Sequence, residues 1–420
     1  MAQDPVSIAE DLLRLVKKVY PGKDNLVNQQ LNPFEAYEAK YEIEDRCGLL
    51  LRTVLGPLGY TTLLAESCQE SSALGFVTEL GVADFLEDRI MTVDKIAEEL
   101  GVKTKFLKVA LSCVTKHGYF EEIDAHSASP AYRNNDLSSI LRKDHPTSLK
   151  DSIGFMCDDG LRATSFLLPA AKVDAPKTTQ GKEAPAISLA FGFEESVFSW
   201  LAKDPIRGKR MGSAMEQLHR VTNENTAFDY DWPTLASPVV DVGGGIGSLE
   251  MILLRNQRQG SLNFIVFDIA ATIENARKEW EKIPASKDFS ISFQAGDFMA
   301  PKFEDTLIPA GKPTYIIRHV LHNWSDEEVV HILGHVRTAM SSNFAANRTV
   351  QPKLLLCETL LLPDSNRWVR AASMQIMAMS SGWTRTEADM IRLLEAAGFL
   401  YIKSHRMRAD DTIVEATLPA

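Results

Sequence analysis

A glycine-rich turn between two regular elements is the part of this chain whose residue types most clearly indicate chemistry. The β-branched run at 238–242 contains Asp241, and four of the next five residues, from Gly243 to Gly247, are glycines. The apolar pattern that begins at Leu249 predicts a helix. A strand, a tight turn and a helix N-terminus in this order let a backbone approach a ligand closely, because glycine has no side chain to obstruct it.

The spacing of these glycines separates two classes of ligand. The dinucleotide fingerprint is Gly-x-Gly-x-x-Gly, whereas here the glycines fall at 243, 245 and 247 and Ser248 follows. With Val240-Asp241 before it, this arrangement resembles the first motif of methyltransferases that use S-adenosylmethionine (SAM). SAM has no phosphate, so Gly243 and Gly245 would admit the amino-acid part of the ligand. An ordinary strand-to-helix turn is the alternative interpretation.

A second reactive segment, 318–328, reads Arg-His-Val-Leu-His-Asn-Trp-Ser-Asp-Glu-Glu. It follows a predicted strand and contains two histidines, His319 and His322. A neutral imidazole with a pKa near 6.5 can accept a proton at neutral pH. A hydrogen-bonded core histidine is the favoured interpretation of His322 if it is considered alone.

The elements that must position these residues alternate between strand and helix from residue 238 onwards. We expect strands at 238–242, 263–268, 288–293, 313–317 and 353–358, helices at 269–281 and 326–341, and an antiparallel strand pair at 401–405 and 412–417. This alternation predicts a doubly wound α/β sheet, in which ligands bind at the carboxyl ends of the strands.

Two acidic residues stand at such strand ends. Asp268 ends the second strand, where a carboxylate can accept hydrogen bonds from two ribose hydroxyls. Asp297 follows the third strand and is placed to accept from an adenine amino group, with Phe298 packed on the ring. A turn or helix-cap role is the alternative for Asp297.

The N-terminal region is mainly helical. We expect helices at 5–19, at 34–55 with an end at Gly56-Pro57, and at 71–85. Two shorter helices near 92–100 and 105–117, followed by a strand at 118–123, outline a winged helix-turn-helix. Lysines on the second short helix suggest DNA binding, but surrounding glutamates favour a solvated face and a dimerisation and substrate-lid module.

The chain therefore divides into a dimerisation domain at 1–147, a helical linker and pocket region at 148–232, and a cofactor-binding catalytic domain at 233–420. A polar stretch at 172–185 reads as an exposed loop. Flexible methionines suit a flat aromatic ligand. The candidate substrate contacts are Met211, Met215, Met377, Met379 and Trp383.

Most of the chain resembles the plant and fungal small-molecule O-methyltransferases that carry an N-terminal winged-helix dimerisation domain. The resemblance rests on the winged-helix outline, the glycine motif, Asp268, Gly296-Asp297, the His-Asn-Trp segment, Glu358, and Arg385-Thr386 before a final helix. It implies an α/β fold with a C-terminal Rossmann-like SAM domain, a homodimer, SAM as the cofactor and no metal.

The same resemblance assigns roles to particular residues. His322 matches the general base, and Glu358 matches the residue that braces it. Asn323 stands where the family usually has Asp, and Arg318 matches a cation near the cofactor. The implied SAM contacts are Asp241, Gly243, Gly245, Asp268, Asp297, Phe298 and Arg318.

One departure from the family pattern suggests an alternative function. The family segment Gly-Lys-Glu-Arg-Thr supplies a second acid that braces the base, and here 382–386 reads Gly-Trp-Thr-Arg-Thr, so that Thr384 replaces it. The first hypothesis is O-methylation of an aromatic hydroxyl on a secondary-metabolite phenol or aromatic polyketide. The alternatives are a pericyclase or dehydratase that binds SAM without consuming it, and a winged-helix regulator that senses SAM.

Composition limits the partners. The chain has 420 residues, a formal net charge of −11 and ordinary apolar content at 45%, which argues against general binding to nucleic acid or anionic membranes. No uninterrupted apolar run approaches the ~20 residues that span a bilayer, and no signal-peptide pattern precedes the first helix. Five scattered cysteines without a C-x-x-C pair suggest reduced thiols and a cytoplasmic protein.

Overall fold

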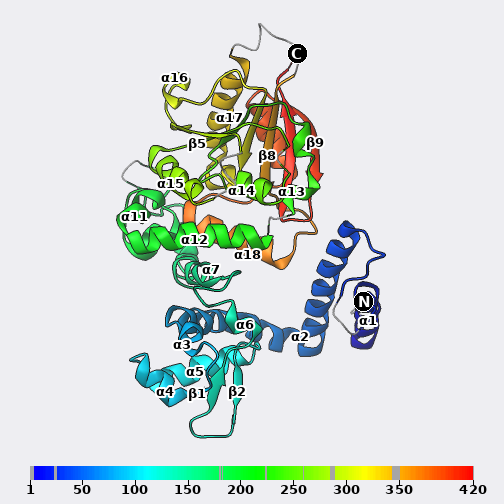
Figure 1. The fold of residues 1–420 in the computed structure, drawn as a ribbon, viewed down its shortest axis with the longest axis vertical. Coiled ribbons are helices and arrows are strands. Elements are labelled where there is room, and N and C mark those ends of the chain that lie inside the picture. The colour runs from blue at the N-terminus through cyan, green and yellow to red at the C-terminus, as the bar shows by residue number, and fades with distance from the viewer. Residues whose placement is uncertain are drawn as a thin grey trace. The chain divides into compact units, whose positions relative to one another are not determined.

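The computed structural model describes residues 4–22, 26–178, 181, 183–222, 225–258, 260–283, 289–342 and 351–419. These residues form two compact units (Figure 1). Unit 1 comprises Met1–Leu168 and Ile187–Leu218, and unit 2 comprises Pro169–Ala186 and His219–Ala420. The predicted boundaries near residues 147 and 232 stay a prediction.

Unit 2 is built on a seven-stranded sheet in the order β6-β5-β4-β7-β8-β10-β9. Strands β4 to β8 are parallel, and β10 is antiparallel to both β8 and β9. The strands are β4 (Val239–Val242), β5 (Phe264–Asp268), β6 (Ile291–Ala295), β7 (Thr314–Arg318), β8 (Lys353–Thr359), β9 (Leu400–Arg406) and β10 (Asp411–Thr417). All seven expected strands are confirmed, although β6 begins three residues later than predicted and residue 288 lies outside the described residues.

Successive residues of the central strands face two different apolar cores. Val240 and Val242 pack into one core with α17 (Asp326–Ser341) and α19 (Glu387–Ala396). Val239 packs into the other with α14 (Ser248–Arg255) and α15 (Ala270–Glu281). Both faces of the strands are therefore covered by apolar side chains, which is why their sequences read as continuous hydrophobic runs.

The remaining elements of unit 2 are short or flank the sheet. They are α13 (Thr226–Asp229), η2 (Trp232–Thr234), α14 (Ser248–Arg255), α15 (Ala270–Glu281), α16 (Phe303–Thr306), η4 (Leu321–Asn323) and α18 (Arg367–Ser380). The expected helix at 269–281 corresponds to α15, and the one at 326–341 to α17.

Unit 1 begins with α1 (Pro5–Val19), as expected, and continues with the 47-residue helix α2 (Pro33–Glu79). The break predicted at Gly56-Pro57 is confirmed, because the backbone of α2 is non-helical at Gly56 and two helical stretches meet there at a kink. Gly56 takes a φ of 66° and a ψ of 177°, a conformation open to glycine. Pro57 then begins the next stretch, where a missing N–H is tolerated.

Helix α2 is poorly covered within the described structure. Its exposed apolar side chains include Leu51, Val54, Leu55, Leu58, Leu63 and Leu64. Length and composition alone would also let part of α2 cross a membrane. That is weak evidence, because an apolar surface of this kind also suits packing against another helix. The absence of membrane contact therefore stays a prediction.

A small module follows α2. It contains α3 (Val82–Leu86), β1 (Met91–Thr92), α4 (Val93–Glu99), α5 (Thr104–Thr115), β2 (Glu121–Ile123) and β3 (Ala131–Arg133), and its strands form a three-stranded sheet in the order β1-β3-β2. The helix expected at 71–85 is split into the end of α2 and α3, because Gly81 takes a φ of 73°. The two short helices and the strand expected after them are present. The winged-helix assignment and the absence of nucleic-acid contact stay predictions.

Short helices make up the rest of unit 1 and its border with unit 2. They are α6 (Asp136–Ser139), α7 (Lys150–Gly154), η1 (Phe155–Gly160), α8 (Leu161–Thr164), α9 (Leu167–Ala170), α10 (Ala186–Phe191), α11 (Val197–Lys203) and α12 (Pro205–Thr222). The mainly helical character expected for 148–232 is confirmed, as is a largely irregular stretch at 172–185.

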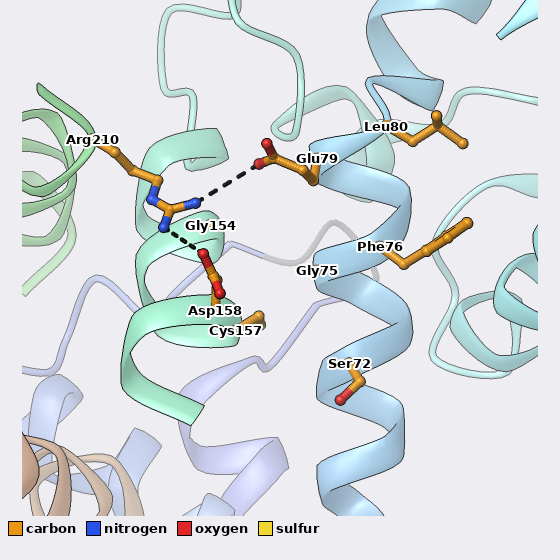
Figure 2. Close-up of a pocket in the computed structure, with 9 residues that line it drawn as sticks. All are labelled: Ser72, Gly75, Phe76, Glu79, Leu80, Gly154, Cys157, Asp158 and Arg210. Carbon is orange, nitrogen blue, oxygen red and sulfur yellow. Dashed lines mark hydrogen bonds and ion pairs between the residues drawn. The ribbon is translucent and has the colours of Figure 1, made fainter. Parts of the chain in front are cut away.

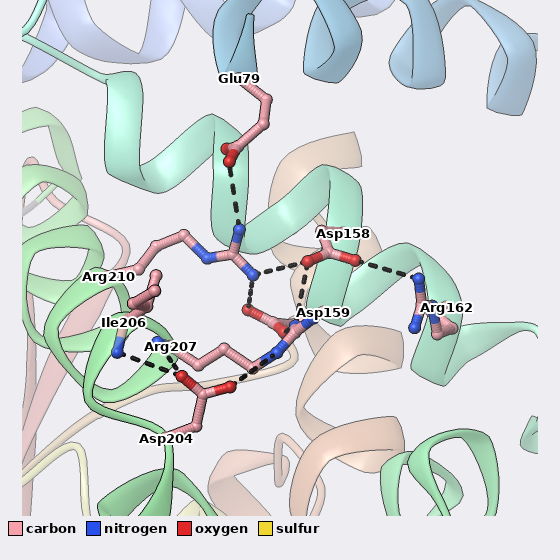
Figure 3. A network of polar contacts seen from close by, with 8 residues as sticks. All are labelled: Glu79, Asp158, Asp159, Arg162, Asp204, Ile206, Arg207 and Arg210. Carbon is pink, nitrogen blue, oxygen red and sulfur yellow. Dashed lines mark hydrogen bonds and ion pairs between the residues drawn. The ribbon is translucent and has the colours of Figure 1, made fainter.

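A cluster of charges fastens η1 to α12 inside unit 1 (Figure 3). Arg210 Nη2 lies 2.7 Å from Asp158 Oδ2 and 2.8 Å from Asp159 Oδ2. Arg207 Nη1 donates to Asp158 at 2.9 Å and also to Asp159. Asp159 is only 1% exposed, so this buried carboxylate is neutralised by two guanidinium groups.

Candidate active site

The turn after β4 combines a close contact with an open space. Gly243, Gly245 and Gly247 all have positive φ, at 76°, 62° and 81°. A Cβ atom on Gly243 would lie 2.6 Å from a methyl group of Val320, whereas a Cβ on Gly245 would meet nothing within 4 Å. Gly243 thus permits tight packing, and Gly245 borders a space that a ligand can enter.

Asp268 is held directly against this turn. Its Oδ2 accepts a hydrogen bond from the Gly245 N–H at 2.9 Å, and its Oδ1 accepts from the Ile269 N–H at 2.7 Å. Burial raises the pKa of Asp268, and these two backbone hydrogen bonds oppose that rise. The Thr272 side chain also hydrogen-bonds to this carboxylate. A carboxylate has about four acceptor positions, so these three hydrogen bonds leave capacity for a hydroxyl of a ligand.

Asp241, Glu250 and Arg318 form a buried charged group next to the glycine turn. Burial raises the pKa of Asp241 to about 7, although Arg318 opposes the rise. Burial and the neighbouring Asp241 carboxyl raise the pKa of Glu250 well above its usual value. Asp241 Oδ1 and Arg318 Nε have no hydrogen-bond partner among the described residues. A polar ligand beside the turn would satisfy such atoms.

Sequence reasoning did not identify Glu250. It lies in the first turn of α14 between buried apolar residues, and an acid within an apolar helix face was the available signal. Such a side chain is rarely buried without a specific partner.

Asp297 and Phe298 lie after β6, as expected. Asp297 is exposed, and its Oδ1 accepts from the Met299 N–H at 2.8 Å, which is the turn role considered as the alternative. Phe298 packs edge-on against Trp324 with 5.8 Å between ring centroids. A contact of either residue with adenine stays a prediction.

His322 lies in η4, immediately beyond the carboxyl end of β7. Its Nδ1 is 2.7 Å from Glu358 Oε2 at the end of β8. The other oxygen, Oε1, accepts from the N–H groups of Val320 at 3.0 Å and Leu321 at 2.7 Å. Glu358 therefore fixes both the imidazole and the backbone that carries it, and the structure brings this predicted pair together.

The ionisation of Glu358 determines which nitrogen of His322 can act as a base. Burial raises the pKa of Glu358, but the charge and hydrogen bond of His322 and the Leu321 N–H outweigh it, so the pKa is lowered. An ionised carboxylate only accepts, so Nδ1 of the neutral imidazole carries the proton and Nε2 the lone pair. No described residue hydrogen-bonds to Nε2, and the side chain is 19% exposed.

Arg385 and Gly382 hold the His322 segment from the opposite side. The buried Arg385 guanidinium donates to the carbonyls of Leu321 and Trp324, both at 2.7 Å, and to Asp326 at 3.0 Å. A Cβ atom on Gly382 would overlap the His322 carbonyl oxygen. The sequence located these residues in a family segment but did not reveal this supporting role.

Thr384 and Asn323 show how the site departs from the expected pattern. Thr384 is buried, and its hydroxyl has no hydrogen-bond partner among the described residues. The Asn323 N–H donates to the Val320 carbonyl at 3.1 Å within the turn. Within the described residues, Glu358 is the only carboxylate that hydrogen-bonds to His322.

Comparison with known proteins identifies the family. Residues 176–400, more than half of the chain, match the O-methyltransferase domain, and residues 63–144 match the O-methyltransferase dimerisation domain. The chain belongs to the O-methyltransferase family. It is a SAM-dependent O-methyltransferase, which confirms the resemblance, the cofactor and the fold class predicted from the sequence.

The methyltransferase has fungal relatives along most of its length. It is 25% identical over 374 residues to the O-methyltransferase xanE of Aspergillus fumigatus, covering 87% of this chain and 81% of the relative. It is 26% identical over 360 residues to the sterigmatocystin 8-O-methyltransferase of Aspergillus flavus, covering 84% and 79%.

Two solved structures show the same fold at low sequence identity. OxaC in complex with SAH and oxaline has a TM-score of 0.75 at 21% identity, covering 99% of both chains. Human N-acetylserotonin methyltransferase in complex with SAM has a TM-score of 0.69 at 21% identity, covering 87% of this chain and 99% of that one.

The predicted substrate contacts of the methyltransferase are distributed over both units. Met211 and Met215 lie on α12 in unit 1, and Met377, Met379 and Trp383 lie in unit 2. Met377 is 43% exposed and Met379 is 8% exposed. Residues two positions apart in an α-helix point about 200° away from each other around its axis. Met377 and Met379 therefore cannot face the same surface. Their grouping in one pocket stays a prediction.

A cavity of about 480 Å³ lies within unit 1 (Figure 2). It is lined by Ser72, Gly75, Phe76, Glu79, Leu80, Gly154, Cys157, Asp158 and Arg210. These residues come from α2 and the residue that follows it, from α7, from η1 and from α12, and none is a predicted site residue. Gly75 allows the helices to approach, because a Cβ there would lie 2.6 Å from the Cys157 Cβ.

No group of three His, Cys, Asp or Glu side chains that could hold a metal ion occurs among the described residues of the methyltransferase. The expected absence of a metal stays a prediction. All five cysteines are free. The cytoplasmic location stays a prediction.

Proposed function

We propose that this methyltransferase transfers the methyl group of SAM to a hydroxyl of an aromatic secondary metabolite, with His322 as the general base. The observation that carries the proposal is the 2.7 Å contact between His322 Nδ1 and Glu358, which leaves Nε2 available. The sterigmatocystin 8-O-methyltransferase among the fungal relatives supports O-methylation of a small secondary metabolite.

The protein residues contribute positioning and proton transfer. SAM, when bound, supplies a methyl group on a sulfonium whose leaving thioether is neutral. His322 Nε2 takes the phenol proton as the oxygen becomes nucleophilic, because a phenol with a pKa near 10 is otherwise protonated at neutral pH. The ionised, buried Glu358 stabilises the resulting imidazolium.

The turn after β4 provides the cofactor site in this proposal. The open space at Gly245 fits a ligand that enters against the backbone. Asp268 would accept from a ribose hydroxyl with its remaining acceptor capacity. Asp241 and Arg318 offer polar atoms that lack partners among the described residues.

We also propose that the protein functions as a homodimer. The dimerisation-domain match and the exposed leucines of α2 support this. Light scattering after size-exclusion chromatography tests it, with a mass twice the 46.6 kDa of the chain as the expected result.

A pericyclase or dehydratase that keeps SAM bound is the second candidate. The observation in its favour is the buried Thr384, which provides no second carboxylate for His322. Mass spectrometry separates the two functions. A product heavier by one CH₂ together with S-adenosylhomocysteine identifies transfer, whereas an isomer or a dehydrated product with unconsumed SAM identifies the alternative.

The decisive experiment measures label transfer from methyl-labelled SAM to a panel of phenols and hydroxylated naphthalenes. His322→Ala is expected to abolish transfer while SAH still binds, as measured by calorimetry. His117→Ala, in unit 1 and remote in sequence from the site, is the matched control and is expected to retain wild-type transfer. Equal transfer by wild type and His322→Ala would refute the assignment of His322 as the base.

A further inference from the structure

A second histidine chain lies beside the His322–Glu358 pair, at the same end of the sheet. His319 Nε2 is 2.6 Å from Asp411 Oδ1, and His319 Nδ1 is 3.1 Å from His219 Nε2. The ring centroids of His319 and His322 are 6.1 Å apart. Asp411 begins β10 opposite Thr359, so all four residues meet where β7 and β8 end.

The hydrogen bonds of this chain have a direction. Asp411 is fully buried; burial raises its pKa, but His319 and Arg318 lower it far more, so the carboxylate is ionised. An ionised carboxylate accepts, so His319 Nε2 donates to it. His319 Nδ1 and His219 Nε2 face each other at 3.1 Å, and in the order of donors in which each ring carries one proton, His219 Nε2 donates to His319 Nδ1.

This order of donors leaves His219 Nδ1 as an acceptor. The atom is buried and has no hydrogen-bond partner among the described residues. Burial, followed by the charge of Arg318, lowers the pKa of His219 well below its usual value, so the ring is neutral. A buried nitrogen with an unused lone pair is unfavourable unless a ligand or water donates to it.

The backbone of His319 supplies independent support. Its φ is 54°, a left-handed conformation that is uncommon for a residue with a side chain. Strained backbones of this kind persist where surrounding contacts over-determine them, and they cluster at functional sites. Here the strain directs the imidazole between Asp411 and His219 directly after β7.

We propose that His219 Nδ1 accepts a hydrogen bond from a second hydroxyl of the aromatic substrate, and that His319 and Asp411 position it. The substrate that receives the methyl group is then an aromatic diol. One of its hydroxyls lies at His322 and is methylated, and the other lies at His219 and orients the ring. This inference rests on the proposed function, because it assigns the substrate class of the same site.

Two amide substitutions separate the roles of the two His219 nitrogens. In Gln the amide lies three bonds from Cβ, like Nε2, so His219→Gln keeps a donor to His319 but loses the Nδ1 acceptor. In Asn the amide oxygen lies two bonds from Cβ, like Nδ1, so His219→Asn keeps an acceptor but loses the contact with His319.

The test compares 1-naphthol with 1,8- and 2,3-dihydroxynaphthalene as methyl acceptors. We expect wild type to favour one diol over 1-naphthol, and His219→Gln to reduce that kcat/KM ratio on the order of tenfold, the value of one hydrogen bond. His219→Asn should retain more of the ratio, and His117→Gln all of it. No preference for a diol, or an unchanged ratio in His219→Gln, would overturn the proposal.

Failure of this inference is distinguishable from failure of the proposed function. If His322→Ala still transfers label, the base assignment fails whatever the His219 variants do. If His322→Ala is inactive but the diol ratio does not depend on His219, only the present inference fails. Nitrogen-15 NMR of histidine-labelled protein gives an independent reading, with the His219 signals assigned from the variant. A proton on Nε2 is expected, and a proton on Nδ1 would overturn the proposal.

Discussion

Unit 1 and unit 2 both bury carboxylates, but they pair them with different cations. In unit 1, Asp158 and Asp159 are held by Arg207 and Arg210. In unit 2, Glu358 is held against His322 at 2.7 Å. A guanidinium stays protonated at every accessible pH, whereas an imidazole gains or loses its proton near neutrality. The first arrangement joins helices, and the second can perform proton transfer.

Two histidines of unit 2 that both contact a buried carboxylate differ in what their other ring nitrogen contacts. His322 and His319 each contact a buried carboxylate at similar distances, 2.7 and 2.6 Å. His322 keeps Nε2 available, but His319 uses its other nitrogen to contact His219. A histidine–carboxylate contact therefore defines a base only when the outer nitrogen is available to the substrate.

Glu358→Gln gives the largest expected effect. If the amide oxygen stays on the N–H groups of Val320 and Leu321, the amide NH₂ faces His322 Nδ1 and forces the proton onto Nε2. We expect kcat to fall about a thousandfold through loss of the basic tautomer. Initial rates with labelled SAM measure this, and SAH calorimetry should show unchanged affinity. A loss below tenfold would contradict the role given to Glu358.

Asp159→Asn tests the structural member of the comparison. The change removes a buried charge and leaves Arg207 and Arg210 with Asp158 and the more exposed carboxylates Asp204 and Glu79. Breaking a buried ion pair from one side leaves uncompensated charge, so we expect the free energy of unfolding to fall by about 3 kcal/mol. Urea unfolding followed by circular dichroism measures it. The kcat of the folded fraction should stay near wild type, and a large loss of kcat would contradict a purely structural role.

The elements around the site were largely predictable because their signals are local. Continuous apolar runs and glycine punctuation identify β4, β5, β7 and the turn at Gly243 without knowledge of the fold. The pairing of His322 with Glu358 required the family resemblance, because nothing local links two residues that are 36 positions apart.

The residues that escaped prediction act through contacts between distant segments. Arg385 reaches the Leu321 carbonyl across 64 positions, and His319 reaches His219 across 100. Glu250 differs, because its partner Asp241 is close in sequence. Burial of the Glu250 carboxyl is what raises its pKa. The helical pattern of the sequence did not predict that an acidic residue would be buried.

Gly382→Ala tests whether close packing positions His322. The added Cβ overlaps the His322 carbonyl oxygen, so we expect about 2 kcal/mol lower unfolding free energy and a loss of kcat. Gly334→Ala is the matched control, because a Cβ there meets nothing within 4 Å on α17. Alanine at that helical position should stabilise the protein slightly. Wild-type kcat in Gly382→Ala would show that the contact does not position the base.

Glu250→Gln tests the buried pair Asp241–Glu250 through pH. A free carboxyl ionises near pH 4, but folded Glu250 keeps its proton to a much higher pH. Folding therefore retains a proton, and wild-type stability falls as the pH rises from about 4 towards the raised pKa. Glutamine does not titrate, so we expect Glu250→Gln to be more stable by at least about 1 kcal/mol at pH 8. Urea unfolding should show little difference at pH 4 to 5, and an advantage independent of pH would contradict the pair.

Glu79→Gln gives the smallest expected effect and completes the comparison of carboxylates around Arg210. Glu79 Oε2 lies 3.9 Å from Arg210 Nη1, but its side chain is 76% exposed. Figure 3 draws this ion pair at the edge of the cluster. Water screens this pair and the long side chain loses conformational freedom in it, so we expect a change below about 0.5 kcal/mol in unfolding free energy. The same urea experiment in low and high salt measures it beside Asp159→Asn. An equal loss of unfolding free energy in Glu79→Gln and Asp159→Asn would show that burial does not determine how much each carboxylate of the cluster stabilises the protein. The contrast between the two units would then depend on the type of cation alone.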